Sequence, residues 1–415
     1  MSRYHLECTE CGRTWEEGPA LLVCPICSEQ QEPGGSTRGV LEVSWSTLPD
    51  RWPSQDPADP RFLAEFLPVD GPGSFPDYPA GGTPLIPAPR LADALRLSSL
   101  WIKDDTRNPS GSTKDRASLL VAAKAREFGL DTIAAASTGN AGTALAAVGA
   151  AAGLRTVVFV PATAPEAKRV QMLSYGARVM PVKAGYDEAF ELCLAACRKF
   201  GWYNRNTALN PFTIEGKKTA ALEIARSLAP ASPDVVVVPV GDGVILAGIA
   251  KGFADLSSAG LLAHRPRLVA VQPAGADAIA RAWAEGAEDV RPLRGAHSVA
   301  DSLTVEAPRN ARLCLRRIRE SDGAVATVTD DEILAAIPEL ASSCGVFAEP
   351  AAAASLAGIR AALREDLVSP GESVVLLVTG TGLKDVPAAA RAVRSPDPIE
   401  PTLEAVARRL QGMRN

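Results

Sequence analysis

Lys114 is the residue whose setting most clearly indicates chemistry. It ends the turn-forming run Asn108-Pro-Ser-Gly-Ser-Thr-Lys114, and a helical stretch follows it. The lysine is therefore expected at a helix N-terminus, where the helix dipole disfavours an ammonium and favours a neutral amine. A neutral amine attacks aldehydes and forms a Schiff base. The alternative is an exposed lysine without a chemical role, and the other motifs bear on that choice.

Loops after apolar strands are candidates for binding an anion, because ligands of open α/β sheets bind at the C-terminal ends of strands. The loop 137–142 reads Ser-Thr-Gly-Asn-Ala-Gly and opens an alanine-rich helix. Its unpaired backbone N–H groups suit a carboxylate or a phosphate, and Asn140 adds a side-chain donor. A plain N-cap is the alternative. The candidate substrate-binding residues of this loop are Ser137, Thr138, Gly139 and Ala141.

Two further loops complete a possible cofactor site. The loop 239–245 reads Pro-Val-Gly-Asp-Gly-Val-Ile, and its glycines allow close backbone approach to an anion if Asp242 points away. Thr379 ends an apolar strand, and its hydroxyl could bond a ring nitrogen or merely cap a helix. A Schiff-base lysine, two anion loops and such a hydroxyl together describe pyridoxal phosphate. The residues expected at the cofactor are Lys114, Asn140, Gly241, Asp242, Gly243, Val244, Ile245 and Thr379.

The first four cysteines form two C-x2-C pairs, Cys8 with Cys11 and Cys24 with Cys27. Two such pairs at this separation can place four thiolates tetrahedrally around zinc. In a segment too short for a core of its own, the metal would supply folding energy. The alternatives are a ribbon that has lost its metal and a pair of disulfides. Four sulfur ligands leave no open position, so a catalytic zinc is not expected.

The positions of strands and helices predict how these residues are brought together. Residues 1–45 are predicted to form a zinc-ribbon-like segment, and the Pro- and Gly-rich residues 46–81 a linker with one short helix near 62–67. Strands then alternate with helices, which predicts an α/β fold with parallel sheets. An amphipathic helix is expected within the C-terminal segment 396–415. The predicted strands are 99–103, 132–136, 156–160, 178–182, 235–240, 268–271 and 373–379, and predicted helices include 115–128, 165–175 and 186–200.

Composition narrows the class of protein further. The chain has 415 residues, a net charge of -5 and no basic stripe, which argues against a nucleic-acid partner. No apolar run is long enough for a membrane span, and the N-terminus lacks an apolar signal region. The four remaining cysteines are scattered among apolar residues, as in reduced proteins. These features predict a cytoplasmic protein without a nucleic-acid or membrane partner.

The motifs taken together resemble the threonine synthase family, among pyridoxal-phosphate enzymes with the tryptophan synthase β-subunit fold (fold type II). The resemblance covers about residues 82–390 and rests on runs that occur in the family's order. It implies two doubly wound parallel-sheet domains, a large cofactor-binding one (82–117 and 214–395) and a small mobile one (118–213), and a homodimer. The runs are 108–116, Ser137-Thr-Gly-Asn140, Ile214-Glu-Gly-Lys-Lys-Thr219, Glu349-Pro-Ala-Ala-Ala353 and Thr379-Gly-Thr-Gly-Leu-Lys-Asp385.

The resemblance also implies individual roles. Lys114 would carry the cofactor and later move the proton at Cα, and Asn140 would bond the cofactor's 3-hydroxyl. The backbone of 241–245 would hold the cofactor phosphate, Thr379 would face the pyridine nitrogen, and the loop 137–141 would receive the substrate carboxylate. The implied reaction converts O-phospho-L-homoserine and water to L-threonine and phosphate.

Departures from the family pattern concern the substrate. Thr113 stands where the family usually has Phe, and Ala208 where it has serine. Thr213 stands where the family has an arginine that helps bind the substrate's phosphate, so a bidentate contact to a dianion is lost. Either another cation supplies that charge, or the enzyme performs β-replacement or β-elimination on a serine- or threonine-like substrate. A non-catalytic homologue is the remaining alternative. The candidate cations are Arg205, Lys217 and Lys218.

Overall fold

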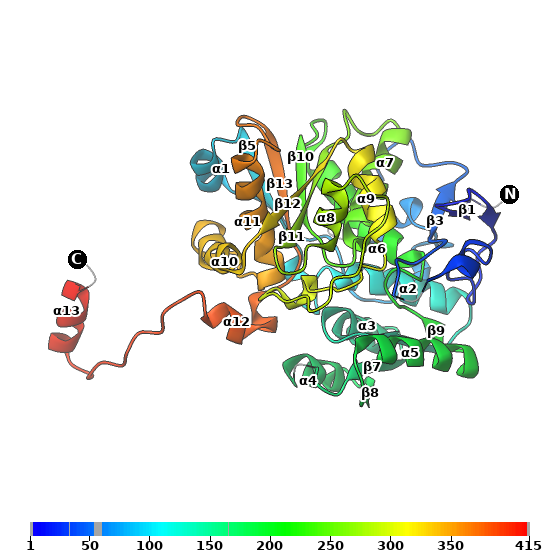
Figure 1. The fold of residues 1–415 in the computed structure, drawn as a ribbon, viewed down its shortest axis with the longest axis horizontal. Helices are drawn as coiled ribbons and strands as arrows, with labels where there is room; N and C mark the ends of the chain where they lie inside the picture. Colours follow the sequence, from blue (N-terminus) through cyan, green and yellow to red (C-terminus); the bar gives the residue numbers. More distant parts are fainter. Residues whose placement is uncertain (1–2, 33, 54–59, 165, 413–415) are drawn as a thin grey trace.

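A computed structural model describes residues 3–32, 34–53, 60–164 and 166–412. Part of the linker, 54–59, and the last residues of the C-terminal segment, 413–415, lie outside the described residues. The body of the molecule contains two parallel sheets, with the N-terminal segment packed at one side (Figure 1). The described residues contain no helix that is both long and apolar enough to span a bilayer.

The larger sheet has six strands in the order β12-β11-β10-β13-β5-β4. All neighbours pair in parallel except β4 and β5, which are antiparallel. The central strand β10 is Val-Val-Val-Val-Pro and is buried throughout, as predicted for a strand covered on both faces. The strands are β4 (Leu85–Pro87), β5 (Ser99–Asp104), β10 (Val235–Pro239), β11 (Arg267–Pro273), β12 (Ala324–Val328) and β13 (Ser373–Val378).

The smaller sheet has four parallel strands in the order β8-β7-β6-β9. Its central strand β6 reads Thr-Ile-Ala-Ala-Ala, and its small side chains let helices pack closely on the sheet. The strands are β6 (Thr132–Ala136), β7 (Arg155–Pro161), β8 (Arg178–Val182) and β9 (Tyr203–Asn204). The α/β class with two parallel sheets is confirmed.

The helices connect these strands and cover both sheets (Figure 1). The predicted helix at 186–200 is found at those bounds, and the lysine loop leads into a helix that begins at Lys114 itself. The short helix expected near 62–67 is a 3-10 helix, η2. The α-helices are α1 (Pro89–Leu95), α2 (Lys114–Glu127), α3 (Asn140–Ala151), α4 (Glu166–Ser174), α5 (Tyr186–Phe200), α6 (Phe212–Leu228), α7 (Val244–Ser258), α8 (Ala278–Ala284), α9 (Ala311–Glu320), α10 (Asp330–Cys344), α11 (Pro350–Arg364), α12 (Val386–Ala390) and α13 (Leu403–Gly412). The 3-10 helices are η1 (Cys27–Gln30), η2 (Pro60–Phe66), η3 (Pro72–Ser74), η4 (Asp105–Arg107), η5 (Asp301–Leu303) and η6 (Gly382–Lys384).

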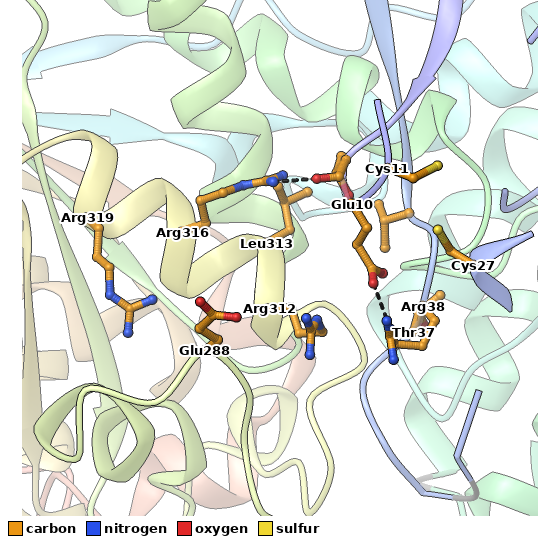
Figure 2. Close-up of a pocket in the computed structure, with 12 residues that line it drawn as sticks. Glu10, Cys11, Cys27, Thr37, Arg38, Glu288, Arg312, Leu313, Arg316 and Arg319 are labelled. Atoms are coloured by element: carbon orange, nitrogen blue, oxygen red, sulfur yellow. Dashed lines mark hydrogen bonds and ion pairs between the residues drawn. The ribbon is translucent and has the colours of Figure 1, made fainter. Parts of the chain in front are cut away.

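The N-terminal segment is a small antiparallel sheet, β2-β1-β3, that packs against the catalytic body. Helix α9 lines a pocket of about 570 Å³ with this segment, and Arg316 from α9 donates to the Thr9 carbonyl (Figure 2). On the other side, the Lys124 ammonium of α2 pairs with Glu17 at 2.7 Å. The segment is therefore anchored by ion pairs and hydrogen bonds to two helices. Its strands are β1 (Tyr4–Cys8), β2 (Thr14–Trp15) and β3 (Leu41–Trp45).

Candidate active site

The loop before Lys114 is held in one conformation by the residue that follows it. The Asp115 carboxylate accepts hydrogen bonds from the Ser110 hydroxyl and from the Ser110 N–H, the latter at 2.7 Å. Gly111 has φ +82°, and a Cβ there would come within 2.8 Å of Thr381. Both the left-handed backbone and the close approach require glycine. The loop thus presents Lys114 as the first residue of α2.

Arg116 fixes the start of α2 to the large sheet. Its guanidinium is completely buried, lies 2.7 Å from the Asp105 carboxylate after β5, and lies 2.6 Å from the Glu223 carboxylate of α6. Two carboxylates around one guanidinium compensate the charge that burial removes from water. The position of Lys114 is therefore defined by contacts on both sides.

The surroundings of Lys114 lower its basicity. Burial is the main cause and lowers the pKa of the amine to about 8. The Glu349 carboxylate opposes this shift, and the positive charge of Arg205 adds to it. Its position at the helix N-terminus acts in the same direction. An amine in this range is available both as a nucleophile and as a base.

The end of β13 lies directly against the lysine loop. The Thr113 N–H donates to the Thr379 carbonyl at 2.8 Å, and the Thr381 N–H donates to the Gly111 carbonyl at 3.0 Å. Thr379 is buried, and no residue in the described part of the chain hydrogen-bonds its hydroxyl. The structure thus brings the third predicted loop next to Lys114 with an unused hydroxyl.

Asn140 and Glu349 form a buried pair at this site. Asn140 Nδ2 donates to Glu349 Oε1 at 2.8 Å, and Asn140 Oδ1 is buried without a partner among the described residues. Burial raises the pKa of Glu349, and the charges of Lys168 and Lys114 oppose that shift. Sequence reasoning named Glu349 only as the first residue of one of the family's runs and assigned no role to it.

The loop after β6 offers backbone donors. The Ser137 hydroxyl accepts from the N–H groups of Gly139 at 3.2 Å and Gly142 at 2.9 Å, so it caps the turn. The N–H groups of Thr138, Asn140 and Ala141 have no acceptor among the residues that the structure describes. Such a set of free amides at the start of α3 suits a carboxylate.

Lys168 of α4 also reaches this loop, and the sequence motifs did not indicate it. A Cβ on Gly139 would lie 3.1 Å from Lys168 Nζ, so the ammonium lies against the loop. Its other contact is an ion pair of 2.9 Å with Asp301 in η5. Lys168 therefore adds positive charge beside the free amides and connects α4 to the loop beside the large sheet.

The loop after β10 offers backbone donors at the N-terminus of α7. None of the N–H groups from Gly241 to Ile245 donates to an acceptor in the described part of the chain. A Cβ on Gly241 would come within 2.9 Å of the Ser302 carbonyl, which explains the glycine. The Asp242 carboxylate accepts from the Arg309 N–H at 2.7 Å, so it has a backbone partner outside the loop.

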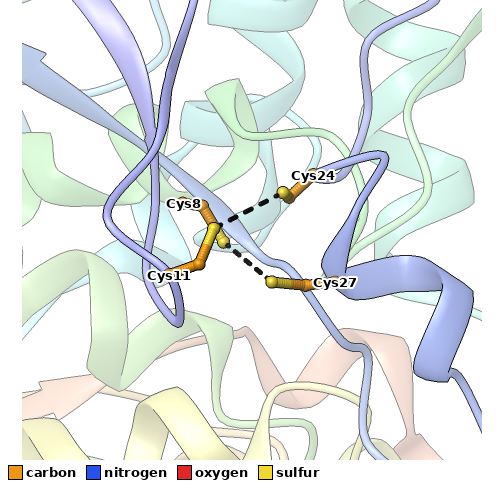
Figure 3. A group of neighbouring side chains, drawn as sticks. All are labelled: Cys8, Cys11, Cys24 and Cys27. Atoms are coloured by element: carbon orange, nitrogen blue, oxygen red, sulfur yellow. Dashed lines mark hydrogen bonds between the residues drawn. The ribbon is translucent and has the colours of Figure 1, made fainter.

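The four N-terminal cysteines lie together in the segment of residues 1–45 (Figure 3). Their sulfur atoms all lie within 4.8 Å of one another, with 3.7 Å between Cys8 and Cys27 and 3.8 Å between Cys11 and Cys24. A tetrahedral zinc with Zn–S of about 2.3 Å places its sulfurs about 3.8 Å apart. All four are free thiols, so the disulfide alternative is not what the structure shows. The donor set fits zinc.

The unpaired polar groups of this site correspond to the functional groups of pyridoxal phosphate. The site contains an amine of lowered pKa, a buried unpaired amide oxygen, a free hydroxyl at a strand end and a row of N–H groups without acceptors among the described residues. An aldehyde, a ring hydroxyl, a ring nitrogen and a phosphate would satisfy these groups in turn. The fold and the site define a pyridoxal-phosphate enzyme with two parallel-sheet lobes.

Comparison with known proteins gives the family. The family model of pyridoxal-phosphate dependent enzymes matches residues 77–380. Threonine synthases of Methanosarcina acetivorans and Methanocaldococcus jannaschii are 34% and 33% identical, and each alignment covers 97% of this chain and 98% of the relative. A third, from Halalkalibacterium halodurans, is 37% identical over 77% of this chain and 88% of its own length. The chain belongs to the threonine synthase family of pyridoxal-phosphate enzymes.

Solved structures agree on the fold. A threonine deaminase of Solanum lycopersicum superposes with a TM-score of 0.65 at 23% identity, covering 75% of this chain and 87% of that one. A maize serine racemase superposes with a TM-score of 0.63 at 20% identity, covering 80% and 94%. At these identities the likeness concerns the fold, which is the predicted fold type II.

Proposed function

We propose that this enzyme is a threonine synthase that converts O-phospho-L-homoserine and water to L-threonine and inorganic phosphate. The observation that carries the proposal is the amine of Lys114, whose pKa is lowered to about 8. The same site contains backbone N–H groups that have no acceptor among the described residues and suit a carboxylate and a phosphate. The nearly end-to-end similarity to proteins named threonine synthase supports the substrate.

The reaction assigns separate roles to the cofactor and to Lys114. Bound pyridoxal phosphate supplies an aldehyde for the Lys114 amine and a ring that delocalises the electron pair left at the substrate's Cα. Lys114 removes the Cα proton and serves as the proton carrier at Cβ and Cγ, which its lowered pKa suits. Phosphate leaves from Cγ as the Cγ–O bond breaks, and water adds its oxygen at Cβ.

The remaining site residues hold the reactants. The free amides of Thr138, Asn140 and Ala141 are proposed to bind the substrate carboxylate, in the turn that the Ser137 hydroxyl and Gly139 hold in place. Asn140 is proposed to contact the cofactor's ring hydroxyl, and the N–H groups of the loop Gly241–Ile245 its phosphate. Thr379, a neutral group, is proposed to face the ring nitrogen, and it would not enforce protonation there as an acid would.

Three further assignments belong to the proposal. Cys8, Cys11, Cys24 and Cys27 are proposed to hold one structural zinc, which supplies folding energy and no open coordination position. Residues 82–117 with 214–395 are proposed as a large lobe and 118–213 as a smaller lobe that moves. The enzyme is proposed to be a cytoplasmic homodimer with an amino-acid substrate.

The test is a phosphate-release assay with O-phospho-L-homoserine beside O-phospho-L-serine, followed by amino-acid analysis. Threonine from the first substrate establishes the reaction. Turnover of O-phosphoserine alone would instead establish β-replacement or β-elimination, the alternative that Thr213 motivates. Lys114→Ala, which lacks the reactive amine, serves as the inactive control.

A further inference from the structure

Two buried cations whose charges act on one another and on Lys114 form no ion pair among the described residues. Lys217 has 1% of its surface exposed, and its Nζ has no hydrogen-bond partner among the described residues. Arg205 is completely buried, and its Nη2 is likewise unpaired within the described part of the chain. A buried cation without a partner costs several kcal/mol unless an anion joins it. The pair is therefore an expected place for a negatively charged ligand.

The third candidate cation is occupied. Lys218 Nζ lies 2.5 Å from the Glu215 carboxylate and 2.8 Å from the Asp255 carboxylate. Lys217 and Lys218 are neighbours in sequence, but they lie about 100° apart around α6 and so meet different surroundings. Lys218 belongs to an ion-paired cluster, and the Lys217 ammonium has no such partner in the described part of the chain.

Lys217 lies close to Thr213, the small residue that stands where the family has an arginine. The two residues are four apart on α6 and therefore lie on the same face, one turn from each other. Side chains of a helix tilt toward its N-terminus, so Lys217 extends over the turn that carries Thr213. The Thr213 hydroxyl donates to the Asn210 carbonyl at 2.8 Å and fills little of that space. A Cβ on Gly248 would lie 2.7 Å from Lys217 Cβ, so the lysine stem packs against α7.

Arg205 approaches from the end of the small sheet. It follows β9, and its guanidinium donates to Ser118 Oγ at 3.2 Å and Thr207 Oγ1 at 2.8 Å. These two neutral acceptors orient the group without neutralising it. Burial is the main cause of the lowered pKa of both Lys114 and Lys217, and the positive charge of Arg205 adds to both shifts. The charge of Lys114 also lowers the pKa of Lys217, and the Asp242 carboxylate opposes that shift. The three positive groups therefore lie close enough for their charges to interact.

We propose that Arg205 and Lys217 form the subsite for the phosphate dianion of the substrate and supply the charge that an arginine at position 213 would otherwise supply. This proposal rests on the proposed function. The cofactor's phosphate has its own donors in the free N–H groups of the loop Gly241–Ile245. Charge beside the Lys114 amine stabilises the phosphate as it leaves Cγ.

The experiment compares holoenzymes of the variants Lys217→Gln and Arg205→Gln with the wild type. Lys199→Gln and Arg155→Gln remove the same charges from exposed positions and are the matched controls. Absorbance of the bound cofactor reports the affinity for O-phospho-L-homoserine, for L-homoserine and for inorganic phosphate in competition with it. A separate titration of apo-protein reports the affinity for the cofactor itself.

The expected result is a loss of about tenfold or more in affinity for O-phospho-L-homoserine and inorganic phosphate, about 1.4 kcal/mol. The affinities for L-homoserine and for the cofactor stay within about twofold, as do all affinities in the two controls. Unchanged affinity for the phosphorylated ligands overturns the proposal. A selective loss of cofactor affinity also overturns it, because the cations would then serve the cofactor's phosphate.

The same measurements separate this proposal from the proposed reaction. If the wild type makes threonine but the variants bind phosphorylated ligand normally, the reaction stands and the subsite fails. If no threonine forms but phosphate binding is lost in the variants, the subsite stands and the reaction fails. Lys217→Met keeps a similar apolar stem and repeats the test should Lys217→Gln fold poorly.

Discussion

Asn140 and Glu349 are 209 positions apart, yet Asn140 Nδ2 lies 2.8 Å from Glu349 Oε1. The bond joins the start of α3, which packs against the small sheet, to the start of α11, which packs against the large sheet. Glu349 is further held by its own N–H, which donates to the Gly380 carbonyl at 3.0 Å. A Cβ on Gly380 would come within 2.4 Å of Glu349 Oε1, so the glycine makes room for the carboxylate. Glu349 therefore links Asn140, through its carboxylate, to the loop after β13, through its backbone N–H.

Removing the acceptor of this bond should weaken cofactor binding. Glu349→Ala leaves the buried Asn140 amide unpaired, at a cost of about 1–3 kcal/mol, and we expect cofactor affinity to fall about tenfold. Glu349→Gln keeps an oxygen acceptor and should stay within about threefold of the wild type. Absorbance titration of apo-protein with pyridoxal phosphate measures both. Equal affinities of the alanine variant and the wild type would contradict the role given to Glu349.

Lys114 should be the residue that carries the cofactor. Borohydride reduction of the holoenzyme is expected to attach the cofactor to the peptide containing Lys114, as mass spectrometry can show. Lys114→Ala should lower the rate of threonine formation by about 100-fold or more, because the positioned base is lost. Lys199→Ala, an exposed lysine on α5, is the control. An adduct on another lysine would rule the assignment out.

Cofactor loading should depend on pH in the range set by Lys114. The neutral amine attacks the aldehyde, and its pKa is lowered to about 8 from the usual 10.5, mainly by burial. The loading rate should therefore rise with pH through a midpoint near 8. Rapid mixing of apo-protein with pyridoxal phosphate at a series of pH values measures it. The pKa of the buried Lys384 is also lowered to about 8, so Lys384→Met should be compared. A midpoint above 10 would show that burial does not activate Lys114.

The same shift predicts how stability changes with pH. Between about pH 8 and 10.5 the folded protein binds fewer protons at Lys114 than the unfolded chain does. Stability therefore rises with pH across that window for this group. Denaturant unfolding of the apo-protein, compared with Lys114→Met, isolates the contribution. A Lys114→Met variant with the same pH dependence as the wild type would argue against it.

The cysteine cluster should bind one zinc ion and stabilise the N-terminal segment. Cys24→Ser removes one of four sulfur ligands and should reduce the bound zinc and the melting temperature of that segment. Elemental analysis and thermal unfolding followed by Trp15 and Trp45 fluorescence report the two effects. Cys344→Ser changes a thiol outside the cluster and should leave the zinc content as it is. Stoichiometric zinc in the Cys24→Ser protein would contradict the assignment.

Local features were determined by the sequence alone. The turn before Lys114, the helix after it, the valine strand β10 and the spacing of the cysteine pairs all depend on residues close together in the chain. Fold class and cofactor follow from these, because backbone dihedrals, helix starts and loop amides are local properties. The edge strand β4, the strand β12 and the short β9 were not predicted, since short strands have too few residues to show a period.

Which polar groups remain unpaired was decided only by the tertiary structure. Lys217 and Lys218 are adjacent and chemically identical, and packing gives Lys218 two carboxylates at ion-pair distance and Lys217 none among the described residues. Glu349 becomes part of the site only because α11 brings it to Asn140 from a distant part of the chain. The free energy of a buried charge depends on the atoms around it, and those atoms come from segments that the sequence does not place side by side.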